Sequence, residues 1–168
     1  MKDAVGSTML VYIVIIVVGI VGSILIASNM YTSAYKVKNN IVSTIDRYYM
    51  INGNTDCFNN NAGNCVTSIN STLKNMGYHY KASCDSIPKK IMSKANIDAD
   101  GNSVGYPIVS SVYPNSGNNG YCLYKIELSD NEYYYSVVTY SHLNINVLGI
   151  GSLFSTPVYG ETRTYYNS

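Results

Sequence analysis

The chain opens with a long apolar stretch. Met9 to Ile26 reads MLVYIVIIVVGIVGSILI, and residues 4–35 contain no Asp, Glu, Lys or Arg. Together with the flanking residues Ser7, Thr8 and Ala27, this stretch approaches the roughly 20 residues that a helix needs to cross the hydrocarbon of a bilayer. The pattern predicts a membrane-spanning helix.

Two other interpretations of this stretch are open. A cleaved signal peptide has a basic start and an apolar part of only about 7 to 15 residues. Here Lys2 is followed at once by Asp3, and the apolar run is longer. A buried core helix is the third option, but the rest of the chain is not apolar enough to surround it. The span remains the best interpretation.

An amphipathic pattern continues directly from the span. Apolar residues recur at steps of three and four with charged and amide residues between them: Met30, Ala34, Val37, Ile41, Ile45 and Tyr48. No proline precedes Pro88, and the first strong helix breaker is the segment 52–54, Asn-Gly-Asn. The sequence therefore predicts one helix from about Val5 to Met50, on the order of 70 Å long. Its second half, from Met30 to Ile45, is expected to pack on a domain.

Small residues follow one face of the predicted span. Gly19, Ser23 and Ala27 recur at steps of four. Such a stripe lets helix backbones approach closely inside a membrane. Chance is the competing explanation, since matches of this type are weak evidence alone.

After residue 51 the composition shifts to Gly, Asn, Ser and Tyr, which predicts mainly strands. Helical periodicity returns once, in a short helix that Gly77 ends as a left-handed cap; its apolar positions are Val66, Ile69, Leu73 and Met76. Tyr121 to Leu128 and Tyr133 to Tyr140 are rich in Tyr, Val and Ile, with four polar residues between them. This pattern predicts a β-hairpin.

The segment 98–102, DADGN, is superficially similar to a calcium-binding loop. An EF-hand loop needs Gly at its sixth position and Glu at its twelfth, where this chain has Ser103 and Val109. We expect a hairpin turn at Asp100-Gly101 instead.

Four cysteines follow the span, and none forms the CxxC pair of zinc or redox sites: Cys57, Cys65, Cys84 and Cys122. We favour the disulfides Cys57–Cys65 and Cys84–Cys122, because the first pair closes a short polar loop. Four buried thiols are the alternative. Disulfides would place the domain outside the cytoplasm, although Lys36, Lys38 and Arg47 after the span favour the opposite orientation. We give the cysteines more weight.

Composition argues against several classes of function. Only 12% of the residues are charged and the net charge is +1, so no basic surface is available for nucleic acid. His79 and His142 lie in no metal-binding or catalytic spacing, and no hydrolase, kinase or P-loop motif is present. The sequence predicts a non-enzymatic protein without cofactor or metal.

The build of the chain resembles a type IV pilin, in which an N-terminal helix, half membranous and half amphipathic, precedes a disulfide-containing antiparallel sheet. The last stretch, VVTYSHLNINVLGIGSLFSTPVYGETRTYYN from Val137 to Asn167, resembles the C-terminal part of TadE-like proteins of the tight-adherence pilus. There a strand is followed by an apolar linker and a final strand, which match 148–153 and 157–166 here. The resemblance implies an α+β fold.

The resemblance also implies a short leader that ends in glycine. Gly6, followed by Ser7, is the matching cleavage position, and Tyr12 matches a family tyrosine. Val11 stands where the family has a glutamate that pairs with the neighbouring subunit's amino terminus. At this position the chain departs from the family pattern.

These observations divide the chain into three parts: a leader or tail (1–6), a transmembrane and amphipathic helix (7–50) and a β-rich extracytoplasmic head (51–168). The leading hypothesis is a structural subunit, major or minor, of a type IV or Tad-type filament. It would start in the membrane and assemble, with pilus machinery, with copies of itself or other pilin-like subunits. The rival is a membrane-anchored adhesion module with a Tyr-rich head. Strand alternation places Tyr133 and Tyr135 on one face and Tyr134 on the other.

Overall fold

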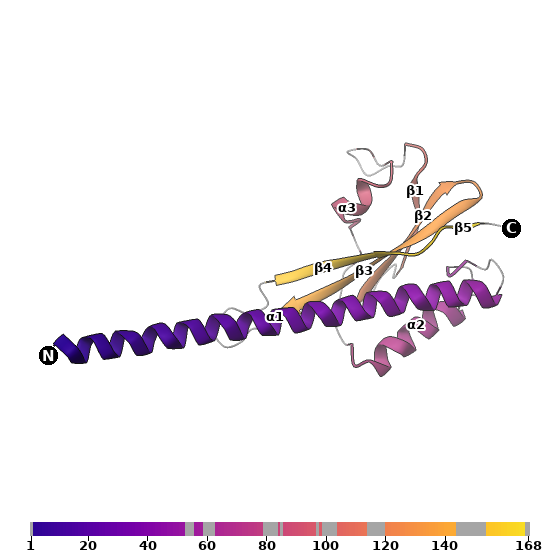
Figure 1. Ribbon diagram of the computed structural model, residues 1–168. Coiled ribbons are helices and arrows are strands. Elements are labelled where there is room, and N and C mark those ends of the chain that lie inside the picture. Colours follow the sequence, from indigo (N-terminus) through magenta and orange to yellow (C-terminus); the bar gives the residue numbers. More distant parts are fainter. Residues whose placement is uncertain are drawn as a thin grey trace.

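The computed structural model describes the following parts of the chain: 2–52, 56–58, 63–78, 84, 86–96, 98, 104–113, 120–143 and 154–166. Its fold is α+β, as the sequence predicts. A long helix, α1 (Lys2–Asn52), lies with its second half along one face of a small antiparallel sheet, and its first half projects beyond the sheet (Figure 1).

Helix α1 is continuous over 51 residues. At 1.5 Å per residue it is about 77 Å long, more than twice the thickness of a hydrocarbon core. The predicted bounds, Val5 and Met50, lie within three residues of the observed ends. The helix is uninterrupted because no proline or pair of helix-breaking residues occurs before 52–54.

Helix α2 (Gly63–Asn75) is the predicted short helix, and Gly77 ends it as expected. The φ angle of Gly77 is 68°, a left-handed conformation that costs glycine little. The N–H of Tyr78 donates to the Leu73 carbonyl and the N–H of Gly77 to the Lys74 carbonyl, each at 3.1 Å. This pair of bonds is a Schellman motif, which satisfies carbonyls that the helix end leaves free.

A second short helix was not predicted. Helix α3 (Lys89–Met92) follows Pro88, which suits the residue before a first helical turn. Four residues are too few to show a 3.6-residue periodicity, so the expectation of a single helix after residue 51 is wrong at this point. Ile91 is its buried residue.

The sheet is antiparallel and has the order β1-β2-β3-β4, with β5 pairing to β3. Its strands are β1 (Ile108–Tyr113), β2 (Tyr121–Ser129), β3 (Glu132–Leu143), β4 (Phe154–Glu161) and β5 (Tyr165–Tyr166). Strands β2 and β3 form the predicted hairpin, in which Ser129 pairs with Glu132 across a two-residue turn. The expected turn at Asp100-Gly101 and the expected linker 148–153 lie outside the described residues.

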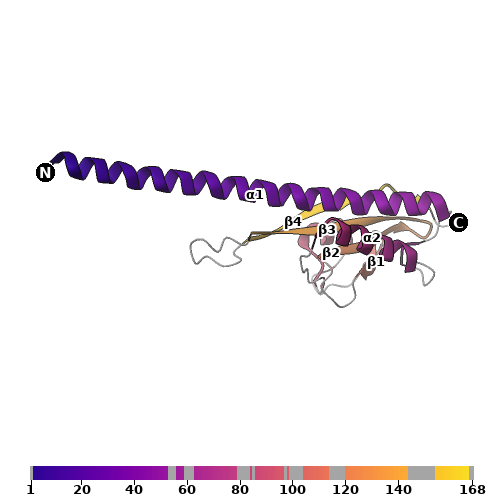
Figure 2. The ribbon, with the colours of Figure 1, turned by 90° about the horizontal axis from the view of Figure 1, so that it is seen from below.

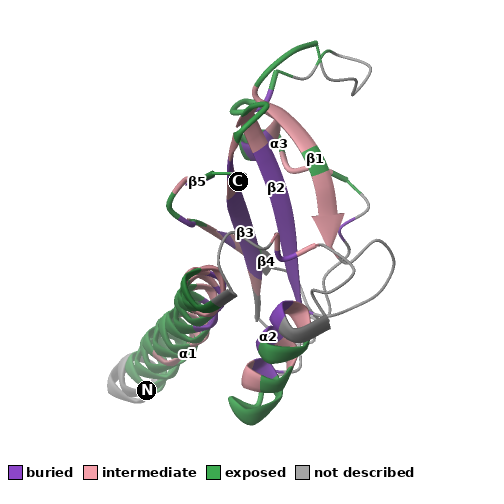
Figure 3. Cartoon of the chain, turned by 90° about the vertical axis from the view of Figure 1, so that its right-hand side faces the viewer, coloured by how far each residue is buried: buried purple, intermediate pink, exposed green. Residues whose placement is uncertain are grey.

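Strand alternation gives the sheet two apolar faces. One face packs against α1 and α2, and the other packs against the segment that contains α3. Strands β2 and β3 are buried over most of their length between these layers (Figure 3). The α1 side carries Leu123, Tyr133, Tyr135 and Val137, and the α3 side carries Tyr124, Ile126 and Val138.

Two disulfides close the head. Cys57 bonds to Cys65 across the connection between α1 and α2, and Cys84 bonds to Cys122 on the central strand β2. These are the two pairs that the sequence analysis favours. Cysteine sulfur is buried at both bridges, so each bridge lies inside one of the two apolar layers.

Candidate functional site: the projecting half of helix α1

The projecting half of α1 is the largest exposed apolar surface of the described chain. Every large hydrophobic residue from Met9 to Ile26 is between 45% and 68% exposed. The helix is long and apolar enough to cross a membrane, and none of its apolar window is buried within the chain. Monomeric soluble proteins rarely expose apolar patches of this size, so the surface marks a contact with lipid or with other helices.

The small-residue stripe lies on this projecting half. A Cβ atom added at Gly19 would meet no heavy atom within 4 Å, so the position is open. The Ser23 hydroxyl donates to the Gly19 carbonyl at 2.8 Å. Because this hydroxyl is satisfied within the helix, Ser23 can face lipid or another helix without an unpaired polar group.

The stripe and the sheet-packing residues belong to one helix face. Stepping by three or four residues leads from Gly19, Ser23 and Ala27 through Met30 to the buried positions, and such steps keep to one side of an α-helix. Ala34, Val37, Ile41 and Ile45 are buried, as expected. Met30 is only partly buried, which differs from the prediction, because it lies one turn before the first helix residue that the sheet covers.

Two contacts fix α1 on the sheet near the start of the packed half. The Thr139 hydroxyl of β3 donates to the Ala34 carbonyl at 3.0 Å and is completely buried. On β4, Gly160 lies directly under the aliphatic part of Lys38, where an added Cβ would come within 2.4 Å of a side-chain carbon. The Lys38 ammonium lies 4.0 Å from the centre of the Tyr35 ring.

A cluster of side chains holds the C-terminal end of α1 against β5. Tyr165 of β5 donates its hydroxyl proton to Asp46, and its ring lies 4.2 Å from that of Tyr49. The Tyr49 hydroxyl donates to the carbonyl of Tyr166 and accepts from its N–H, at 3.1 and 3.2 Å. Arg163 covers the Tyr49 and Tyr165 rings at 5.7 Å. The end of the described chain is thereby fixed to α1, more than 110 residues earlier in sequence.

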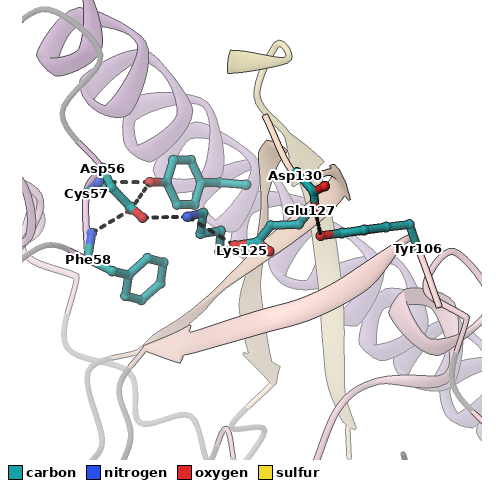
Figure 4. A network of polar contacts seen from close by, with 8 residues as sticks. Asp56, Cys57, Phe58, Tyr106, Lys125, Glu127 and Asp130 are labelled. Carbon is teal, nitrogen blue, oxygen red and sulfur yellow. Dashed lines mark hydrogen bonds and ion pairs between the residues drawn. The ribbon is translucent and has the colours of Figure 1, made fainter. Parts of the chain in front are cut away.

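A polar network fixes the connection between α1 and α2 to the sheet (Figure 4). The Lys125 ammonium lies 2.6 Å from Asp56 and 3.3 Å from Glu127. Asp56 also accepts from the Phe58 N–H at 2.9 Å and from the Tyr135 hydroxyl. The network holds the chain beside the Cys57–Cys65 bridge.

This network shifts the ionisation of its members. Burial raises the pKa of the Asp56 carboxyl, but the hydrogen bonds from Lys125, Tyr135 and Phe58 and the Lys125 charge outweigh it, so the net pKa is lowered. Burial raises the pKa of Tyr133 to about 12, with a smaller contribution from the Asp56 charge. The Asp56 carboxyl is therefore ionised at neutral pH and ties the connection between α1 and α2 to Lys125 of β2. Sequence reasoning missed this ion pair, although a lone lysine within the apolar strand YCLYKIEL signals a required partner.

The tyrosines proposed as an adhesion platform are not exposed. Tyr133 and Tyr135 are buried on the face that packs against α1, and Tyr134 is partly buried on the other face. The alternation of the triplet is as predicted, but the helix covers the side that carries two tyrosines. A platform made of this triplet is therefore excluded.

A small depression lies on the sheet face opposite α1. It has a volume of about 190 Å³ and is bordered by Lys90, Lys94, Tyr159 and Glu161 among others. Lys94 already pairs with Glu161, and the Lys90 ammonium lies 4.7 Å from the centre of the Tyr159 ring. Since both cations are engaged within the chain, we assign this depression no ligand.

Other predicted positions carry no further chemistry in the described parts of the chain. Gly6 and Ser7 lie on the continuous backbone of α1, and the proposed leader cleavage between them stays a prediction. His142 lies on β3 opposite Ser155, and His79 is outside the described residues. Within those residues, no group of three metal-ligating side chains gathers.

The arrangement is that of an apolar helix held firmly by a small disulfide-closed head. No protein-family model, curated protein or solved structure matches the chain. The resemblance to TadE-like proteins and type IV pilins therefore stays a prediction from the sequence.

Proposed function

We propose that this protein is a non-catalytic, pilin-like structural subunit, major or minor, of a type IV or Tad-type surface filament. In this role the first half of α1 lies in the membrane before assembly and packs among the helices of neighbouring subunits afterwards. Its partners are copies of itself or other pilin-like subunits and the machinery that assembles them. Neither cofactor nor nucleic acid takes part.

The observation that carries the proposal is the division of α1 into two halves. The second half is fixed to the head by buried apolar contacts and by hydrogen bonds at both of its ends. The first half has an apolar surface that nothing in the described chain covers. A firm head on a rigid apolar helix presents that helix to lipid or other helices in a fixed direction.

The open sheet edges offer poor surfaces for assembly, which leaves the helix. Strand β1 is one edge, and Ser110 forms a bulge there between Val109 and Ser111. Strand β4 is the other edge, and it contains Pro157, which has no N–H to donate. Bulges and prolines are devices by which proteins prevent edge strands from pairing with other chains.

The two disulfides support an extracytoplasmic head. Disulfides form and persist in oxidising compartments and are rare in the cytoplasm. We therefore place the amino terminus of α1 on the cytoplasmic side and the head outside, with an extracellular location once the subunit is in a filament. The basic residues Lys36, Lys38 and Arg47 do not oppose this orientation strongly, because they lie on the part of α1 that packs beside the head.

The proposal is tested by adding bulk to the small-residue stripe. In the Gly19→Leu/Ser23→Leu variant the span stays apolar, so insertion is expected to persist. Two added side chains hold neighbouring helices apart, and the subunit is expected to be lost from sheared surface filaments. The control is Val17→Phe/Val21→Phe, which adds bulk at the same spacing on the opposite face of the span, where both positions are exposed.

Filaments that contain the stripe variant at the normal level would contradict the proposal. The rival function, a membrane-anchored adhesion module, makes the opposite prediction for the head. Tyr106 and Tyr166 are exposed tyrosines there. Loss of adhesion on their replacement by Ala, with assembly unchanged in both helix variants, would favour the adhesion module.

A further inference from the structure

The shared end of β3 and β4 and the projecting half of α1 both belong to segments that contain no Asp, Glu, Lys or Arg. Residues 4–35 contain no Asp, Glu, Lys or Arg, and neither do residues 133–160. The second segment includes most of β3 and β4. Both views show the shared end of these two strands lying beside α1 and pointing toward its projecting half (Figures 1 and 2).

Two contacts calibrate the position of β3 along α1. Thr139 bonds to Ala34, and Tyr133 pairs with Tyr165, which bonds to Asp46. From Thr139 to Tyr133 the strand covers about 20 Å, at roughly 3.3 Å per residue. From Ala34 to Asp46 the helix covers about 18 Å, at roughly 1.5 Å per residue. The two lengths agree, so β3 and α1 run side by side in opposite directions.

The same calibration gives the level of the strand ends. Beyond Thr139, β3 continues for four residues to Leu143, which pairs with Phe154 at the start of β4. These four residues cover about 13 Å, which corresponds to about nine residues of helix. The backbone of Leu143 and Phe154 therefore lies about level with Leu25, in the last turn of the apolar stretch Met9–Ile26.

We propose that this end of the β3–β4 hairpin is a second membrane contact, resting in the lipid headgroup layer beside the helix that crosses the bilayer. The inference depends on the anchoring of α1 in the proposed function. The headgroup layer adds about 5 to 8 Å on each side of the hydrocarbon, so strand ends level with Leu25 cannot stay in bulk water. Because residues 133–160 carry no Asp, Glu, Lys or Arg, none of these charges has to lose its hydration there.

A contact of this kind fixes the direction of the head relative to the membrane. A single spanning helix leaves the head free to rotate and tilt, whereas a second contact point removes part of that freedom. The subunit would then wait at the membrane in one orientation, and the hairpin would leave the headgroup layer when the subunit is drawn into an assembly.

The chain contains no tryptophan, so a single introduced tryptophan reports its own surroundings. Thr156 is exposed and pairs with Ser141, which places it about level with Met30, in the proposed headgroup layer. Asn131 is exposed in the turn at the opposite end of the sheet and provides the control. Val17 lies in the middle of the apolar stretch and reports whether α1 is inserted.

Each variant of the full chain, Thr156→Trp, Asn131→Trp or Val17→Trp, is placed in liposomes of phosphatidylcholine with bromine atoms either near the headgroup end or near the methyl end of the acyl chains. Bromine quenches tryptophan that lies close to it. Relative to unbrominated liposomes, we expect Thr156→Trp to lose fluorescence with bromine near the headgroups, Val17→Trp to lose it with bromine near the chain ends, and Asn131→Trp to keep it in both. Circular dichroism and intact mass verify that all three keep the fold and both disulfides.

The remaining outcomes separate the two proposals. If Val17→Trp is quenched but Thr156→Trp is quenched no more than Asn131→Trp, the hairpin contact is wrong and the anchoring stands. If Val17→Trp is not quenched, both are wrong. If the fluorescence of Thr156→Trp changes only when the protein-to-lipid ratio is raised, and bromine does not quench it, a neighbouring copy and not lipid covers this end. That result also overturns the inference.

Discussion

At the scale of single residues, charged groups inside the head act as ties between distant parts of the chain. Lys125 is nearly buried in the central strand, where an unpaired ammonium would be costly. Asp56, Glu127 and the Tyr133 ring surround it. Clusters of this kind fix a unique arrangement more than they add stability, because removing charges from water offsets much of their attraction.

The Lys125–Asp56 ion pair predicts how the removal of Asp56 changes the stability of the head. Asp56→Ala leaves Lys125 with Glu127 alone and is expected to lower the free energy of unfolding by about 1 to 3 kcal/mol, less than for a fully buried pair because Asp56 is partly exposed. The double variant Asp56→Leu/Lys125→Met should lose less than Asp56→Ala, since the buried ammonium is removed and Glu127, which loses its partner, is partly exposed. Urea denaturation in detergent at neutral pH measures both. Equal or greater loss in the double variant would contradict this account.

The same carboxyl predicts the direction of the pH dependence. The native pKa of Asp56 is below its ordinary value of 3.8, so its stabilisation is complete above that pH and is lost as the pH falls through 3.8 toward the native pKa. Asp56→Asn should therefore lose less stability than the wild type between neutral pH and pH values below 3.8. An equal acid sensitivity in the two proteins would exclude Asp56 as a source of the loss.

At the scale of elements, α1 is one continuous helix with two environments. Its packed half contributes buried residues at steps of three and four, and its projecting half contributes none from residue 8 onward, where side-chain burial is described. Tertiary packing and not helix propensity stabilises most protein helices in water. The packed half depends on the sheet, and the projecting half depends on lipid or on partner helices.

This division predicts that substitutions in the two halves of α1 differ in their effect on the free energy of unfolding of the head. Ile41→Ala removes a fully buried side chain between helix and sheet, and we expect a loss of about 2 to 5 kcal/mol in the free energy of unfolding. Ile16→Ala removes the same atoms from an exposed position on the projecting half and should leave the unfolding of the head almost unchanged. Urea denaturation followed by near-ultraviolet circular dichroism of the buried tyrosines measures the head. A similar loss in both variants would contradict the division.

At the scale of the whole molecule, two disulfides join segments that the sheet and helices bring together. Cys57–Cys65 spans 8 residues and Cys84–Cys122 spans 38. A bridge that closes a longer loop restricts the unfolded chain more, and loop entropy gives about 2.5 kcal/mol for the first and about 4 kcal/mol for the second.

We therefore expect Cys84→Ser/Cys122→Ser to destabilise the head more than Cys57→Ser/Cys65→Ser, by about 1 kcal/mol. Intact mass of the wild type under alkylation without reductant should show no modified cysteine, because all four are paired. Equilibrium unfolding of the two paired variants gives the difference. Alkylation of all four thiols in the unreduced protein would exclude the bridges and weaken the argument for an extracytoplasmic head.

The sequence by itself determined those features that depend on local pattern. The apolar run and the three-and-four spacing after it predicted α1, Gly77 predicted the end of α2, and the Tyr-rich runs predicted the β2–β3 hairpin. Helix faces, left-handed caps and strand alternation are set by neighbouring residues, so they can be read without knowing the fold.

The tertiary structure decided which surfaces remain exposed. Alternation separated Tyr133 and Tyr135 from Tyr134, but only the packing of α1 showed that the first two are buried. The Lys125–Asp56 ion pair joins residues 69 positions apart, and the Tyr165–Asp46 hydrogen bond joins residues 119 positions apart. Such contacts depend on how the elements are placed in space, and side-chain spacing along the chain does not encode that placement. The level of the β3–β4 end beside the apolar half of α1 has the same origin.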